Sequence, residues 1–163
     1  KIKEDIKNPT FSLKINAFIP EEFANEQDKI EMYQEIQICS SLDSLYSYKK
    51  KAKDMFGKLP ESVSLVFDKR EIDLLAKEAG VNKIQDKLKC VEFSLGEPYI
   101  NIKGIGNMLF EAFIPYLSRV KLSYIRHNFV IEVTKTDKIL DDIKGILSSF
   151  LNILNTNKVV EIK

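Results

Sequence analysis

The sequence predicts a single α+β domain in which helices pack on a small mixed or antiparallel sheet. Three observations indicate this fold class. Apolar and polar residues alternate with the period of a strand over 11–17, 90–95 and 129–133. Apolar residues recur at helical spacing over much of 25–80, and a long amphipathic helix closes the chain. Strands and helices do not alternate strictly, which argues against a doubly wound parallel sheet.

The first strand follows a polar lead-in over residues 1–10. It covers 11–17 and ends at the Ile19-Pro20 pair. Pro20, followed by two glutamates, suits a first helical turn, because proline needs no N–H there and acids favour the helix dipole. A helix over 25–38 should then turn Ile30 and Tyr33 inward.

Two further helices are expected before residue 80. A capping box that begins at Ser40 opens the first of them, which runs to Phe56. Gly57 is the expected left-handed stop. Leu59-Pro60 opens the next helix, and Gly80 ends it.

The second half alternates between short strands and helices. Strands are expected over 81–84 and 90–95, and a short helix over 101–113. A hairpin over 120–133 should turn near His127. The last helix carries a continuous apolar stripe, although it contains Gly145, which costs about 1 kcal/mol relative to alanine. The stripe consists of Ile139, Leu140, Ile143, Ile146, Leu147, Phe150, Leu151 and Leu154.

Composition limits the classes of function. The 163 residues include 25 basic and 24 acidic side chains, for a net charge of +1. This balance argues against a surface devoted to nucleic acid or anionic lipid. The basic residues are nearly all lysine, and the only arginines are Arg70, Arg119 and Arg126. Bidentate recognition of phosphate or guanine, which uses the guanidinium group, is therefore disfavoured.

Location and cysteine chemistry are expected to be those of a cytoplasmic protein. Cys39 and Cys90 lie far apart without metal-ligand spacing, so two reduced thiols are expected. No stretch approaches the length of a membrane span, and no apolar signal segment precedes the domain. The chain begins at Lys1 rather than methionine, as expected of a piece of a longer protein.

Residues for catalysis are scarce. His127 is the only histidine, and its expected place is a solvated turn. Gly104 and Gly106 lack the third glycine of a dinucleotide loop, and no Walker-type phosphate loop occurs. Acidic pairs such as Asp141-Asp142 lie at expected helix starts, where the dipole explains them. No catalytic residue, cofactor site or metal site is therefore predicted, and a small enzyme is the least favoured interpretation.

One local concentration of charge lies over residues 46–53. Lys49, Lys50, Lys51 and Lys53 lie beside Tyr46 and Tyr48. Aromatic rings beside lysines can bind single-stranded nucleic acid. Consecutive lysines on a helix point in different directions, however, so a solvated face is the favoured interpretation. A nucleic-acid-binding module that uses this helix, with Lys121 or Arg126, stays open as an alternative.

A series of motifs over residues 11–84 resembles the C-terminal domain of bacterial transcription-repair coupling factors. Each motif is common by chance, but their order and spacing are not. Residues 85–157 agree with that family only in element order, and the whole of 11–157 is expected to form the domain. The counterparts are Ile19-Pro20, Lys29-Ile30 with Tyr33, Asp54-Met55-Phe56-Gly57, Leu59-Pro60 and Ala79-Gly80-Val81.

The resemblance implies a regulatory role. The family's full-length protein is an ATP-driven DNA translocase that removes stalled RNA polymerase, with ATP and Mg²⁺ bound in its motor domains. Its C-terminal domain packs on an N-terminal UvrB-like module and masks the surface that recruits UvrA. The implied role is autoinhibition in transcription-coupled nucleotide excision repair, without a cofactor in this domain.

The candidate docking surface of the resemblance is Lys51, Asp54 and Met55. The family usually has glutamate where this chain has Lys51, and arginine where it has Met55 and Lys29. If the family contact uses acids against arginines of the UvrB-like module, Asp54 alone remains. A weaker mask, or a partner of altered charge, is therefore expected here.

Overall fold

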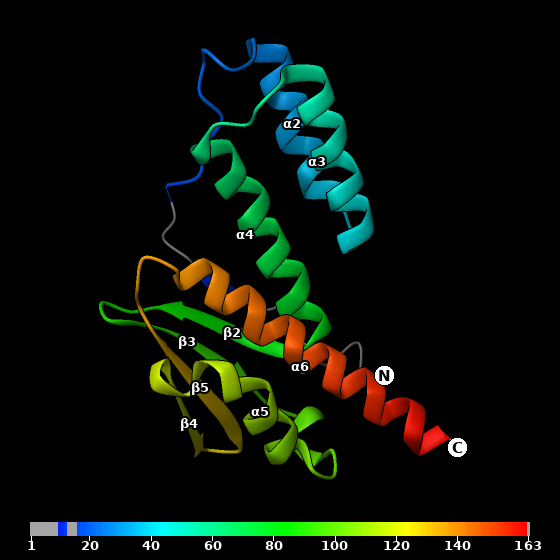
Figure 1. Cartoon of the computed structure of the whole chain (residues 1–163), viewed down its shortest axis with the longest axis vertical. Helices are drawn as coiled ribbons and strands as arrows, with labels where there is room; N and C mark the ends of the chain where they lie inside the picture. The colour runs from blue at the N-terminus through cyan, green and yellow to red at the C-terminus, as the bar shows by residue number, and fades with distance from the viewer. Residues whose placement is uncertain (1–9, 13–15, 163) are drawn as a thin grey trace. The chain divides into compact units, whose positions relative to one another are not determined.

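The structure is a computed structural model that describes residues 10–12 and 16–162 (Figure 1). It divides into two compact units, one of residues 14–74 and one of residues 1–13 and 75–163. Of the expected lead-in, residues 1–9 lie outside the described residues, as do 13–15 of the expected first strand. Helices and a mixed sheet are both present, so the predicted α+β class is confirmed.

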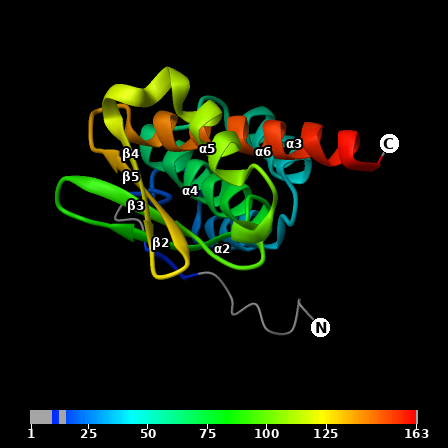
Figure 2. The same cartoon turned by 90° about the horizontal axis from the view of Figure 1, so that it is seen from below.

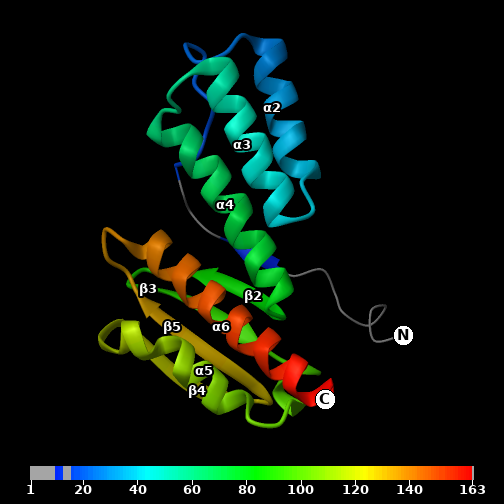
Figure 3. The same ribbon diagram turned by 45° about the vertical axis from the view of Figure 1, so that its right-hand side comes forward.

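The unit of residues 14–74, called here the helical unit, contains α2 (Glu26–Ile38), α3 (Leu42–Phe56) and most of α4 (Glu61–Glu78). Helices α2 and α3 run side by side as a hairpin, as Figures 1 and 3 both show. Its core is apolar and consists of Ile19, Met32, Ile36, Cys39, Leu45, Ala52, Leu59, Val63, Phe67 and Leu74.

Capping side chains set the helix ends in this unit. The Asn25 side chain accepts the N–H of Asp28 at 2.8 Å and starts α2. Ser41 and Ser44 form a reciprocal capping box at the start of α3, one residue later than the sequence predicts. Gly57 ends α3, as predicted, but its φ of +81° and ψ of −155° lie outside the expected left-handed helical region. Glycine alone adopts this conformation without strain.

Two expectations in this unit are wrong. Residues 21–24 form turns rather than a helical turn, because the cap at Asn25 starts the helix later. Ile30 and Tyr33 are 45% and 38% exposed. The inward positions of α2 are instead Met32 and Ile36, spaced by four.

The second unit, called here the sheet unit, contains a five-stranded mixed sheet of order β1-β2-β3-β5-β4. β1 pairs parallel with β2, and the other neighbours are antiparallel. Ala17 lies outside any strand, contrary to its assignment from the alternation. The strands are β1 (Thr10–Ser12), β2 (Val81–Asp86), β3 (Cys90–Leu95), β4 (Val120–Ile125) and β5 (Asn128–Thr134).

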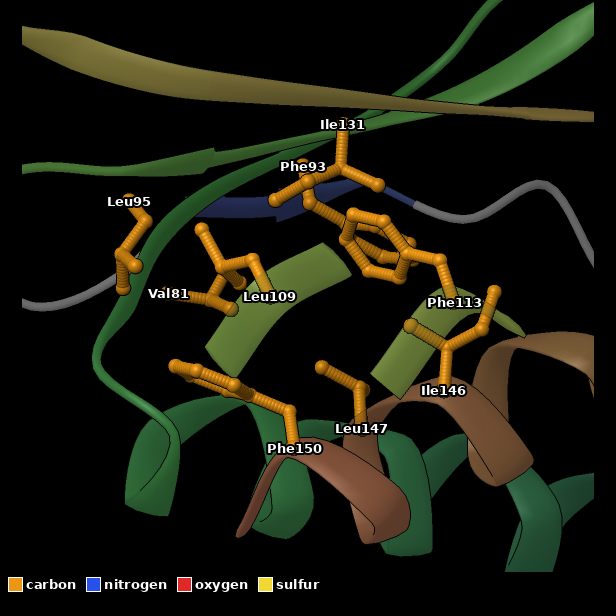
Figure 4. Close-up of a pocket in the computed structure, with 9 residues that line it drawn as sticks. All are labelled: Val81, Phe93, Leu95, Leu109, Phe113, Ile131, Ile146, Leu147 and Phe150. Atoms are coloured by element: carbon orange, nitrogen blue, oxygen red, sulfur yellow. The ribbon is translucent and has the colours of Figure 1, made fainter. Parts of the chain in front are cut away.

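Helices α5 (Ile105–Phe113) and α6 (Ile139–Ile162) lie on the same face of this sheet (Figures 2 and 4). α5 begins later than expected, because a separate 3-10 helix covers Tyr99–Asn101. A second 3-10 helix, η2 (Ile114–Arg119), follows α5. The predicted β4–β5 hairpin is confirmed, with Arg126 and His127 at its tip.

The core of the sheet unit is dry and closely packed. Phe93 and Ile131 from the sheet face Leu109 of α5 and Phe150 of α6 (Figure 4). The void between these side chains measures about 20 Å³ and is lined only by apolar residues. A space of that size holds about one water molecule, and an apolar wall offers it no hydrogen bonds. This void is therefore a packing feature and not a ligand site.

Side chains of η2 explain two unusual residues of α6. The Tyr116 hydroxyl occupies the place that a side chain on Gly145 would need. Asp142 is 5% exposed and accepts two bonds from Arg119, at 2.8 Å from Nε and 3.1 Å from Nη2. The sequence suggested that the helix dipole explains Asp142, but the dipole by itself does not account for this residue. It forms a bidentate pair with a residue 23 positions earlier in the chain.

Candidate docking surface

The candidate docking residues share one exposed face of α3. The helix is anchored by Leu45 and Ala52, which are buried. Asp54 and Met55 lie three and four residues after Lys51, so both are neighbours of Lys51 on the helix surface. All three are exposed, and the Met55 side chain is 61% exposed. These three residues are called here the docking face.

A packed support holds the end of α3 beneath this face. The Phe56 ring lies 5.3 Å from the ring of Phe23, centroid to centroid. The backbone N–H of Gly57 donates to the Lys53 carbonyl at 2.8 Å, and Leu59 is buried directly afterwards. The motif residues of this segment therefore form the platform and not the contact surface.

The remaining motif residues join the chain entry to the helices. Ile19 is 1% exposed, and its N–H donates to the Tyr33 hydroxyl at 2.8 Å. The N–H of Phe18 donates to the Ser62 carbonyl at 3.2 Å, just after Pro60. Tyr33 thus has a backbone partner despite its partial exposure, which gives it a structural role.

The surroundings of the docking face carry more positive than negative charge. An open pocket of about 480 Å³ beside Gly57 is lined in part by Lys53 and Lys58. Lys51 adds a third cation, while Asp54 is the one acid of the docking face. Among the residues that the structure describes, neither Lys51 nor Asp54 forms an ion pair. Both charges are available to a partner.

The Lys-rich segment 46–53 is divided between core and surface. Tyr48 is half-buried with its ring 6.1 Å from that of Phe67, and Lys49 places its ammonium 5.8 Å from the same ring. Tyr46 is 49% exposed and shares its side of the helix with Lys50 and Lys53. One aromatic side chain, rather than two, is thus presented beside lysines.

Other candidates for chemistry are dispersed. His127 lies exposed in the β4–β5 turn with φ of +64°, far in sequence from both free cysteines. Burial, followed by the Glu132 carboxylate, raises the pKa of Cys90 and disfavours its thiolate. Over residues 10–12 and 16–162, no group of three or more metal-ligating side chains is assembled. Within the same ranges, no helix has the length and hydropathy needed to cross a membrane.

Comparison with known proteins identifies the family. The model of the TRCF domain matches residues 13–103, which is more than half of the chain. The chain belongs to the TRCF domain family. The match includes the helical unit from α2 onward, with all three residues of the docking face, and continues through β3.

Relatives of this TRCF domain are transcription-repair-coupling factors. The protein of Staphylococcus aureus strain USA300 is 29% identical over 147 residues, and that of Staphylococcus haemolyticus is 30% identical over 144. These alignments cover 89% and 88% of the chain but 12% of each relative. The chain therefore spans about an eighth of the length of these relatives.

A solved structure confirms the fold. The crystal structure of the C-terminal domain of a transcription-repair coupling factor superposes with a TM-score of 0.78 and 18% identity. The superposition covers 91% of this chain and 95% of the other. At this identity the likeness supports the architecture, including the long final helix.

Sequence patterns missed one polar site in the helical unit. Arg70 and Asp73 of α4 line a pocket together with residues of α2 and with Ala17. These positions are distant in sequence, so no local spacing could bring them together. The one available signal was the rarity of arginine in this chain.

Proposed function

We propose that this TRCF domain is a regulatory docking domain of a transcription-repair coupling factor and has no catalytic role of its own. In the parent protein, motor domains that bind ATP and Mg²⁺ would drive translocation on DNA and removal of stalled RNA polymerase. This domain would bind the N-terminal UvrB-like module and mask the surface that recruits UvrA. The role proposed for it is autoinhibition in transcription-coupled repair.

The observation that carries this proposal is the docking face. Met55 offers an exposed apolar contact beside two charges that lack ion-pair partners among the described residues. Apolar side chains with flanking charges are typical of protein interfaces, in which charge sets specificity and the buried apolar group provides affinity. The aromatic and glycine contacts beneath the face hold it in one conformation, which lowers the entropy cost of binding.

Charge reversal at Lys51 tests the contact directly. We expect Lys51→Glu to tighten binding to the UvrB-like module about fivefold, if that module presents arginines, because an exposed repulsion becomes an attraction of up to about 1 kcal/mol. The measurement is isothermal titration calorimetry of the chain against the purified module of the same parent protein. UvrA should compete with both forms.

The matched control is Lys83→Glu, the same change at an exposed position of β2. It should leave the affinity unchanged. Equal affinities of the unsubstituted chain and the Lys51→Glu chain for the module would contradict the proposal that the docking face contacts it. A weaker Lys51→Glu complex would show that the partner presents acids, and would overturn the assumption of arginines while retaining the contact.

A second candidate function is nucleic-acid binding through Tyr46, Lys50 and Lys53, which share one exposed side of α3. Two lysine–phosphate contacts to a single strand would give a slope of about −1.4 in log affinity against log salt. With Tyr48 half-buried and a single exposed aromatic, we expect no gel shift of single-stranded DNA near physiological salt. A shift abolished by Lys50→Glu would favour this alternative over the docking domain.

A further inference from the structure

A pocket of about 200 Å³ opens in the helical unit between α2, α4 and the segment that precedes α2. Ile36 and Val66 form its apolar part, and Gln37, Arg70 and Asp73 form its polar part. Pockets for drug-sized ligands measure about 300–1,000 Å³. The space here suits one side chain rather than a cofactor.

Two polar atoms at this pocket lack partners. Arg70 is held in place because its Nη2 donates to the Cys39 carbonyl at 2.9 Å. Its Nε is buried and has no hydrogen-bond partner among the described residues, and the same holds for Oδ1 of Asp73. Native proteins rarely leave buried polar atoms unpaired, so such atoms call for a specific explanation.

The two atoms differ in hydrogen-bonding character. Arg70 supplies N–H donors, and Asp73, one helical turn later, supplies an acceptor. A carboxamide group carries a carbonyl oxygen beside an NH₂ group and matches this pair. A carboxylate matches it less well, because a second negative charge would lie beside Asp73.

The state of Asp73 supports this choice. Burial raises the pKa of Asp73, while the positive charges of Arg70 and Lys69 oppose the rise. A carboxylate that received hydrogen bonds from N–H donors would show the opposite tendency. An N–H donor from an occupant would therefore stabilise the ionised form of Asp73.

We propose that this pocket binds the side-chain carboxamide of a glutamine or asparagine presented by a partner protein. The carboxamide oxygen accepts a hydrogen bond from Arg70, and its NH₂ group donates to Asp73. The methylene groups of the occupant pack on Ile36 and Val66. Because Arg70 Nε and Asp73 Oδ1 are both buried in the structure, the proposal requires the two side chains to turn toward the pocket when the occupant binds. This site is separate from the docking face and does not depend on the identity of the docking partner.

The test uses the ¹⁵N-labelled chain and N-acetyl-glutamine amide as the probe. We expect saturable shifts of the Arg70 Nε–H signal and of backbone signals near residues 36–37 and 69–73, with a Kd of about 1 mM for a ligand of this size. N-acetyl-glutamate amide should bind about fivefold more weakly or worse. No saturable shift up to about 50 mM probe would overturn the proposal. Equal or tighter binding of the glutamate probe would also overturn it, in favour of a carboxylate site.

Three variants locate the effect. Asp73→Ala removes the acceptor and should weaken probe binding about fivefold or more. Val66→Met fills the apolar part of the pocket and should weaken probe binding without changing either polar group. Lys50→Gln, at an exposed site on α3, is the control and should leave the affinity for the probe unchanged. Unchanged probe affinity in a folded Asp73→Ala chain would overturn the proposal. If Asp73→Ala fails to fold, unchanged probe affinity in the Val66→Met chain would overturn it instead.

Discussion

Phe67→Ala is expected to lower the free energy of unfolding of the helical unit by about 4 kcal/mol. The ring of Phe67 is 1% exposed and lies in the core of the helical unit. It also supports Tyr48 and Lys49 of α3. Loss of the ring leaves a cavity beneath the helix that carries the docking face. Thermal melts, with hydrogen exchange followed separately over α2–α4 and over the sheet, measure the effect.

The matched control is Phe110→Ala. Its ring is 55% exposed on α5, so the same substitution should change the free energy of unfolding by less than about 1 kcal/mol. We also expect Phe67→Ala to weaken binding to the UvrB-like module. Faster exchange over the sheet but not over α2–α4 in the Phe67→Ala chain would contradict the assignment of Phe67 to the helical core.

Gly80→Ala is expected to lower the free energy of unfolding by about 3 kcal/mol, through two additive causes. Gly80 has φ of +82°, and alanine in this region costs about 1 kcal/mol or more. The Tyr99 ring occupies the space that the new methyl group would need, and forcing atoms into a packed site costs about 1–3 kcal/mol. Chemical denaturation of the sheet unit measures the sum.

Gly57→Ala measures a backbone cost without a steric one. Gly57 has nearly the same φ, +81°, and no atom lies within 4 Å of the place a methyl group would take. Its substitution should therefore show a backbone cost alone, of about 1–3 kcal/mol, because ψ of −155° places Gly57 in a region nearly restricted to glycine. A further Tyr99→Ala change in the Gly80→Ala chain should recover stability only if the ring is the obstacle.

Local sequence signals predicted the elements well where one interaction dominates. The stop at Gly57, the hairpin tip near His127 and the apolar stripe of α6 each depend on residues within one or two turns of the chain. The start of α3 was displaced by one residue because Ser40 and Ser41 are both capable caps, and the structure uses Ser41. The motif order of residues 11–84 also identified the family.

Sequence signals failed where the deciding partner is distant. Ile30 is apolar, but tertiary packing places Met32 and Ile36 inward instead. Asp142 has the position of a dipole-stabilising acid, yet its partner is Arg119 of another element. The pocket at Arg70 depends on three separate segments and has no local pattern. The docking face was named from a resemblance, and the structure places its three residues together; their role stays a prediction.

The pairing of β1 with β2 has a consequence for the order of folding. Thr10 lies opposite Lys83 in the sheet, so the whole helical unit is inserted between two neighbouring strands. Closing a chain segment of this length carries a large entropy cost, whereas contacts within a helical hairpin are local. The helices should therefore form early, and the edge strand should join last. Force applied to the N-terminal end would detach that strand first and leave the four antiparallel strands intact.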